Sequence, residues 1–425
     1  MSALPFFTSM TRFWREKSRA ELIAWVLWGA ATVHLTFMRP PGALIPGERS
    51  QLLGGILCAL SLGAALLVKG GRKGAGSRAE VAVSLVLAAL LVLSGLFSLT
   101  PLSSSLRGFV ILASSLGGFW CARLLLRTAP ARVLFLKVSL ILLTGILVVG
   151  LASHFITGEV HRLLDANHHP VASRLLLLWW GPLALLFMPG TTLGPRLGSW
   201  LLLTVSYIVL YLNVLRSTLV IPLIMGIEAA LFQAWRWRYV LLAAIPILGL
   251  TAYLAAHVPD FRKGPGSESF YYRVENYRFS LYIALKHPVL GIGLRAPREE
   301  FLKGYDLKSP YVSQEQFARS VERIRTSENI FLTFLAEAGF PFTLLYLFAL
   351  VILLTRLVRQ ARAPAPAAAI PPLALLLPLT GALLHFQLLD GLFHPQISWF
   401  FHLLLGMIGP EKSRITENSQ KPGGF

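Results

Sequence analysis

The stretch EVAVSLVLAALLVLSGLFSLT occupies residues 80–100 and has one charged residue, at its first position. Its apolar residues run on without the period-two alternation that marks a strand of a membrane barrel. About 20 apolar residues are enough to cross a hydrocarbon core ~30 Å thick as a helix, which satisfies its own backbone hydrogen bonds. The stretch therefore predicts a membrane-spanning helix.

Similar stretches recur along the whole chain. Its 425 residues are 55% hydrophobic and 14% charged, with a mean hydropathy of +0.64, whereas a soluble domain has about 25% charged residues. We predict an all-α, polytopic membrane protein with about 12 transmembrane helices and one long extracytoplasmic loop that carries short helices. The predicted spans are 20–38, 51–68, 80–100, 106–126, 132–153, 172–188, 197–213, 217–234, 239–257, 329–355, 370–389 and 396–410.

Positive charge orients these spans. The net charge of +19 comes mainly from Lys and Arg in short loops beside helix ends, so we expect no nucleic acid partner. With the basic N-terminus in the cytoplasm, every second loop on that side carries basic residues, which predicts an even number of spans and two cytoplasmic termini. These residues are Lys69, Arg72, Lys73, Arg78, Arg127, Arg132, Arg196, Arg236, Arg238, Arg356, Arg359, Arg362, Lys412, Arg414 and Lys421.

One long loop interrupts the apolar pattern. Residues 258–328 mix polar, charged and aromatic side chains and fall on the extracytoplasmic side. We therefore divide the chain into a transmembrane bundle over 1–257, a loop module over 258–328, further transmembrane helices over 329–410 and a cytoplasmic tail over 411–425. Cys58 and Cys121 each lie inside a predicted span and are interpreted as small core residues.

Arg216 lies in the sequence NVLRSTLV, at a tight extracytoplasmic hairpin between two spans. One interpretation is a side chain that reaches the lipid headgroups. The other is a guanidinium that binds a phosphate group in bidentate fashion, with hydroxyl donors from Ser217 and Thr218. The sequence leaves both open.

A second group of candidates lies in RVENYRFSLYIALKHPVLGIGLR, residues 273–295. Gly291 and Gly293 are expected to form a tight turn with positive φ. The order of an Arg, an aromatic residue, a Pro and a Gly-x-Gly turn resembles the O-antigen ligase and O-antigen polymerase family. Arg273, Tyr277 and Pro288 occupy the first three of these positions.

The resemblance continues in two later segments. In SENIFLTFLAEAGF, residues 327–340, the family pattern has a His-Asn pair, and this chain has Glu328 before Asn329. In LLHFQLLDGLFHP, residues 383–395, the chain offers the His, Asp and Pro that family members often carry near the outer face. Together with Arg216, the resemblance covers about residues 200–410.

The resemblance implies a membrane glycosyltransferase of the C-type fold in a bacterial inner membrane, with its active face in the periplasm. Its donor would be an undecaprenyl-diphosphate-linked glycan, and its acceptor lipid A-core for a ligase or a lipid-linked glycan for a polymerase. Arg216 and Arg273, with Arg278 as a third contact, would stabilise the diphosphate leaving group. We expect no cofactor and no metal, and membrane lipid as a further partner.

The acceptor hydroxyl needs a base. The resemblance assigns this role to the position of Glu328, and a carboxylate can accept a proton at hydrogen-bond distance. A purely structural interpretation is a carboxylate that favours a helix N-terminus. His385 and Asp390 are the other catalytic candidates. With His394 they imitate the spacing of a metal site, but without a fourth ligand we favour a structural or hydrogen-bonding role.

Two other classes of protein stay open. A transporter or flippase would carry internal repeats and mid-span charges, which the sequence lacks, and a non-catalytic assembly subunit would fit the missing family His. The sequence also leaves ligase and polymerase, including an exopolysaccharide polymerase, as equal alternatives.

Overall fold

The computed structural model describes residues 17–37, 47–68, 76–98, 100–165, 168–213, 216–232, 265–307, 312–324, 327–363, 370–387 and 391–409. All regular structure within these ranges is helical, which confirms the predicted all-α class. The predicted span 239–257 and the tail 411–425 lie outside the described residues. So do Asp390 and the side chain of Arg216.

Seven helical segments of the described chain are long and apolar enough to cross a membrane. They confirm a multi-pass architecture and account for seven of the predicted spans. All helices of the described chain, membrane-spanning or not, are in order α2 (Arg19–Thr36), α3 (Gly47–Leu67), α4 (Arg78–Leu96), α5 (Pro101–Leu125), α6 (Ala129–Thr157), α7 (His168–Leu178), α8 (Trp180–Phe187), α9 (Leu193–Leu212), α10 (Arg216–Phe232), α13 (Pro265–Lys286), η1 (Arg298–Gly304), α14 (Gln314–Ile324), α15 (Ile330–Arg362), α16 (Pro372–His385), η2 (Gly391–Phe393) and α17 (Pro395–Gly406).

Local sequence sets where several helices begin. Ser18 and Glu21 form a capping box at the start of α2, and Ser77 and Glu80 form another at the start of α4. In each box the serine hydroxyl and the glutamate carboxylate satisfy backbone N–H groups that the helix leaves without a partner. These two boxes fix the ends of α2 and α4 at the face that the charge pattern assigns to the cytoplasm.

The predicted span 172–188 is interrupted. α7 ends at Leu178 and α8 begins at Trp180. Pro182 lies in the first turn of α8 and has no N–H to donate to the carbonyl of Leu178, so the hydrogen-bond ladder is broken there.

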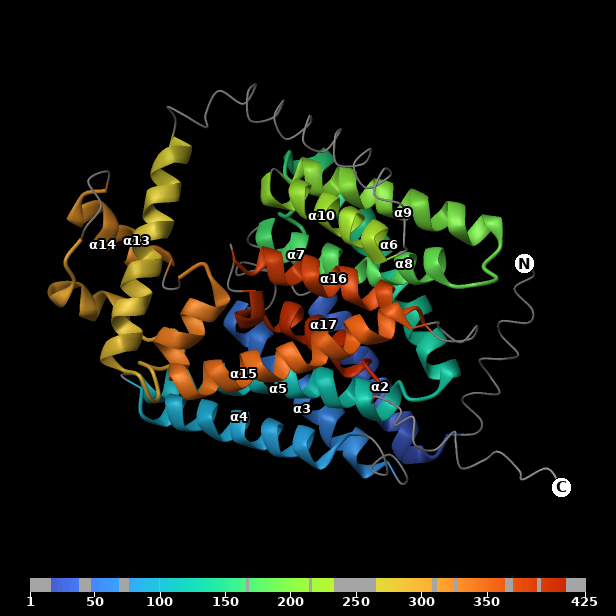
Figure 1. Cartoon of the computed structure of the whole chain (residues 1–425), viewed down its shortest axis with the longest axis horizontal. Helices are drawn as coiled ribbons and strands as arrows, with labels where there is room; N and C mark the ends of the chain where they lie inside the picture. The colour runs from blue at the N-terminus through green and yellow to red at the C-terminus, as the bar shows by residue number, and fades with distance from the viewer. Residues whose placement is uncertain are drawn as a thin grey trace.

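The core is built around α17. All twelve residues of this helix are buried, and it packs most extensively on α5 and also on α7 and α2. Figure 1 shows α17 in the middle of the bundle, with α4, α5 and α15 on one side and α7, α8 and α16 on the other. A helix that is apolar and buried all round is typical of the centre of a membrane bundle.

Salt bridges join helix ends that the charge pattern assigns to one side. Glu80 at the start of α4 accepts from Arg123 Nη2 at 2.9 Å and from Arg356 Nη1 at 3.0 Å. Arg123 also donates to the carbonyl oxygen of Ile408, just after α17. The start of α4 therefore lies beside the ends of α5, α15 and α17, as an alternating up-and-down bundle requires.

The segment between α13 and α15 has a small core of its own. Phe279 and Ile283 of α13 pack with Phe317 and Val321 of α14. α14 turns its apolar side to this cluster and its charged side outward, as the alternating sequence indicates. Figure 1 shows α13 and α14 together at one end of the bundle, next to the start of α15.

Candidate functional site

The candidate site lies where α13, the start of α15 and the end of α16 meet. Nε of Arg273 donates to Oε2 of Glu328 at 3.4 Å, across 55 positions of the sequence. The two side chains keep 30% and 26% of their area exposed. Both groups are therefore partly open to a ligand.

Glu328 has an uncommon backbone conformation. Its φ is +56°, in the left-handed region, which costs a residue with a Cβ about 1–2 kcal/mol. Such a conformation persists only where neighbouring contacts hold it, and it is found most often at ligand and active sites. In this conformation the carboxylate of Glu328 accepts from Arg273 of α13.

Asn329 supplies much of this support. Its side-chain oxygen accepts from the N–H groups of Phe331 and Leu332, which caps α15. Its Nδ2 donates to Oε1 of Gln387 at 3.0 Å. Asn329 thus fixes the first turn of α15 and attaches it to the end of α16.

Tyr277 lies on the same face of α13 as Arg273, because residues four apart on a helix are neighbours. Its hydroxyl donates to the carbonyl oxygen of Gln387 at 2.8 Å. Gln387 therefore binds Tyr277 through its backbone and Asn329 through its side chain. This residue holds the three segments in register around the Arg273–Glu328 pair.

The Gly-x-Gly turn, which follows α13, attaches this helix to α15. Gly291 and Gly293 have φ of +65° and +94°, which confirms the predicted turn. The N–H of Gly293 donates to the carbonyl oxygen of Glu337 at 2.9 Å. A Cβ on Gly291 would lie 2.3 Å from the carbonyl carbon of Glu337, closer than any real contact. The turn is a docking element between two backbones.

The helix that receives this turn is itself broken. Gly339 inside α15 has φ +85° and ψ 171°. A Cβ there would lie 2.3 Å from the carbonyl oxygen of Val289. The N–H of Phe340 leaves the helical ladder and donates to the carbonyl oxygen of Pro288 at 2.8 Å. Pro288, a position of the motif, and Gly339 therefore form one joint between the turn and α15.

Glu337 completes this joint. It is fully buried, and its Oε2 accepts from the N–H of Arg295 at 2.7 Å. Its carbonyl oxygen accepts from Oγ of Ser94 at 2.8 Å, which links the joint to α4. A buried carboxylate that accepts backbone N–H groups stabilises the loop after the turn.

His385 lies at the end of α16, two residues before Gln387, and is fully buried. Its Nδ1 is 2.8 Å from Oγ of Ser173, and its Nε2 is 3.3 Å from Nδ1 of His169. His394 lies within electrostatic range of Arg295 and His169. The structure thus brings these histidines together beneath the site, and their catalytic role remains a prediction.

Arg278 has a different partner from Arg273. Its Nη1 donates to Glu275 Oε2 at 3.3 Å, and 54% of its side chain is exposed. Five residues advance a helix by ~140° beyond a full turn, so Arg278 points away from the face of Arg273. Tyr305 also donates to Glu275, and burial together with this hydrogen bond raises the pKa of the Tyr305 phenol. The predicted third diphosphate contact remains a prediction.

A buried network of hydrogen bonds around Arg174 was not predicted from the sequence. Arg174 in α7 is fully buried and forms a salt bridge with Asp165 at 2.9 Å. It also donates to the carbonyl oxygen of Thr36 at the end of α2, and Gln396 of α17 donates to Asp165 at 3.2 Å. The available signal was an Arg inside an apolar span, since such a residue is rare unless it has partners.

The two side chains of the salt bridge offer different chemical groups to a ligand. Arg273 is suited to bind phosphate oxygens, and Glu328 is suited to accept a proton. Within the described ranges, no group of three or more His, Cys, Asp and Glu side chains has the proximity to hold a metal ion.

One comparison with known proteins gave a match, and it covers most of the part of the chain that forms the site. Residues 197–347 match the protein-family model described as O-Antigen ligase. This range includes most of α9, all of α10, α13, η1 and α14, and the first half of α15. Arg216, Arg273 and Glu328 all lie within it. A search of curated proteins gave no match.

Proposed function

Because residues 197–347 match the O-Antigen ligase model, we propose that this chain is a membrane glycosyltransferase that uses an undecaprenyl-diphosphate-linked glycan. The acceptor is lipid A-core or a second lipid-linked glycan. The reaction takes place at the periplasmic face of the inner membrane, where the α13–α14 segment lies.

One observation carries the proposal, the partly exposed salt bridge between Arg273 and Glu328. These residues come from separate motifs and meet at a site held by Tyr277, Asn329 and Gln387. The left-handed backbone of Glu328 is a conformation found most often at ligand and active sites, which supports a functional role for the pair. The pair supplies one group for each half of a glycosyl transfer.

The reaction forms a bond between the acceptor oxygen and the anomeric carbon of the donor sugar. The bond between that carbon and the diphosphate oxygen breaks, and the electron pair leaves with the diphosphate. Arg273 and Arg216 stabilise the added negative charge. Glu328 accepts the proton of the acceptor hydroxyl. The bound diphosphate takes Arg273 as its partner, which leaves the Glu328 carboxylate available as the base.

The test uses a strain in which the gene is deleted and then restored with variants of equal membrane abundance. The measurement is the rate of glycan transfer in isolated membranes, with the surface polysaccharide profile as a second readout. We expect Arg273→Ala and Glu328→Gln to lower the rate about 100-fold or more, since each removes a group that acts in the transition state. Glu328→His restores the base of the family pattern and should keep most of the rate.

Arg319→Ala is the matched control. Arg319 lies in the same loop module, is 76% exposed and pairs with Glu315 within α14, so its loss should leave the rate unchanged. Equal rates for Arg273→Ala, Glu328→Gln and Arg319→Ala would refute the Arg273–Glu328 site. A rate that stays unchanged in the deletion strain itself would refute the enzyme and favour a transporter or an assembly subunit.

The polysaccharide profile of the deletion strain separates the two activities. Single repeat units on lipid A-core indicate a polymerase. Bare core together with long lipid-linked chains indicates a ligase.

A further inference from the structure

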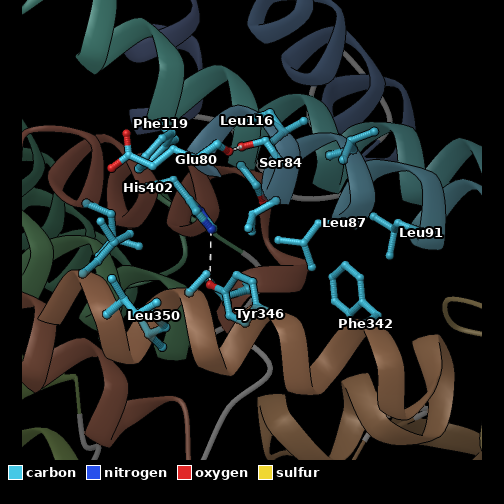
Figure 2. A pocket seen from close by; sticks show the side chains of 18 of the residues that line it. Glu80, Ser84, Leu87, Leu91, Leu116, Phe119, Phe342, Tyr346, Leu350 and His402 are labelled. Carbon is cyan, nitrogen blue, oxygen red and sulfur yellow. Dashed lines mark hydrogen bonds between the residues drawn. The ribbon is translucent and has the colours of Figure 1, made fainter. Parts of the chain in front are cut away.

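An apolar cavity lies between α4 and α15, away from the candidate site. Its walls are formed by Leu87 of α4, Leu116 and Phe119 of α5, and Tyr346 and Leu350 of α15, among others. Figure 2 shows Leu87, Leu91 and Phe342 at one end and Glu80 at the other. Ile352 also lines the cavity and is 42% exposed, so the cavity opens sideways to the bilayer.

The cavity is separate from the candidate site. Ser94 of α4 donates to the carbonyl oxygen of Glu337 in α15 and holds the two helices together. Phe334 and Leu392 also line the cavity, whereas Arg273 and Glu328 do not.

The opposite end carries positive charge. Arg356 lines the cavity, and it shares the single carboxylate oxygen Oε1 of Glu80 with Arg123. Two guanidinium groups thus face one carboxylate. Arg123 is 5% exposed, and its buried Nε has no hydrogen-bond partner among the residues that the structure describes. A buried cationic group in this state favours an additional anion nearby.

The straight part of α15 that lines the cavity runs from Phe342 to Arg356, and fourteen residues of α-helix rise ~21 Å. The cavity therefore reaches from the charged end past the middle of a hydrocarbon core ~30 Å thick. A single acyl chain with its phosphate at the charged end fills this depth, whereas a polyprenyl chain is long enough to cross the whole bilayer.

We propose that this cavity binds one acyl chain of an anionic phospholipid, whose phosphate group is held at Arg356 beside the Glu80–Arg123 pair. The leaflet is the one at the basic face of the bundle, opposite the candidate site. The hydrogen bond from Tyr346 to Nε2 of His402 at 3.2 Å, drawn in Figure 2, pairs the polar groups of the wall and leaves an apolar surface for the chain.

The test measures lipid binding to the purified full-length protein by native mass spectrometry. The probes are phosphatidylglycerol and phosphatidylethanolamine with the same acyl chains. We expect tighter binding of phosphatidylglycerol, and about a tenfold loss of that affinity in Arg356→Gln, since one charge-assisted hydrogen bond is removed. Ala349→Trp places an indole in the cavity and should abolish the bound lipid.

Two control variants lie on the same helix. Arg359→Gln removes a positive charge that does not line the cavity, and Phe348→Trp adds bulk on a side chain that is 62% exposed. Both should bind phosphatidylglycerol like the wild type. Leu353→Phe, a smaller filling substitution at a lining position, replaces Ala349→Trp if that variant does not stay monodisperse.

Three results would overturn the proposal. The first is equal binding of the two phospholipids. The second is wild-type binding of phosphatidylglycerol by both Arg356→Gln and the variant that fills the cavity. The third is displacement of phosphatidylglycerol by undecaprenyl phosphate, which would assign the cavity to the donor lipid. None of them depends on glycosyl transfer, so this test and that of the enzyme activity stand apart.

Discussion

At the scale of single residues, the motif between Arg273 and Gly339 separates into two sets. Arg273 and Glu328 face an open site. Gly291 and Gly339 instead make room for backbone contacts between the turn and α15, and Gly293 makes room for the side chain of Ser98, since each has a positive φ and a close neighbour. The sequence predicted the turn, because glycine favours this conformation. It did not show that the turn docks on the break in α15, because that contact depends on residues some forty positions apart.

Gly291→Ala should destabilise the protein more than Gly158→Ala does. Both glycines have positive φ, +65° and +75°. A Cβ at Gly158 meets nothing within 4 Å, whereas at Gly291 it would overlap the backbone of Glu337. We expect a loss of about 1 kcal/mol for Gly158→Ala from the backbone alone, and at least ~2 kcal/mol more for Gly291→Ala from overpacking. SDS-induced unfolding of the purified protein measures both, and equal losses would contradict the proposed joint.

At the scale of the helices, α15 carries most of the design of the site. It begins at an Asn cap, breaks at Gly339 and continues to Arg362. The hydropathy of residues 329–355 predicted a span and was correct about its start. Hydropathy could not reveal the break, because it averages over a window. It takes no account of single hydrogen bonds such as those that the N–H groups of Phe340 and Gly293 donate across the joint.

Asn329 has two functions that substitutions can separate. Asn329→Ala removes the cap and the bond to Gln387, and should cost about 2 kcal/mol in the free energy of unfolding. Asn329→Asp keeps an oxygen that caps the helix and loses only the amide donor to Gln387. We therefore expect Asn329→Asp to recover most of the stability while glycan transfer stays low. Full transfer in Asn329→Asp would show that the bond to Gln387 does not position the site.

At the scale of the whole molecule, composition and charge pattern predicted the class, and the salt bridges among Glu80, Arg123 and Arg356 show why the helix ends alternate as they do. Arg273 and Glu328 could be chosen as candidates because they stand in linear motifs, and the structure brings the two side chains together. Their roles remain predictions. Gln387 and the Arg174–Asp165 pair were missed, because their roles arise from packing between helices far apart in sequence.

The arrangement of the chain across the membrane is the remaining prediction at this scale. Residues 340–362 of α15 rise ~34 Å, enough to cross the hydrocarbon core, so the two ends of this helix belong on opposite sides.

In a background with Cys58→Ala and Cys121→Ala, Arg319→Cys on α14 should react with a membrane-impermeant maleimide in intact cells. Arg359→Cys and Arg196→Cys should react only after the membrane is permeabilised. Arg359 lies in the last turn of α15 and Arg196 in the first turn of α9, at the helix ends where the charge pattern places the cytoplasm. Reaction of Arg319→Cys and Arg359→Cys from the same side would be incompatible with α15 as a membrane-spanning helix. Reaction of the three positions with sides exchanged would keep the bundle and place the Arg273–Glu328 site in the cytoplasm, where a donor exported to the periplasm could not reach it.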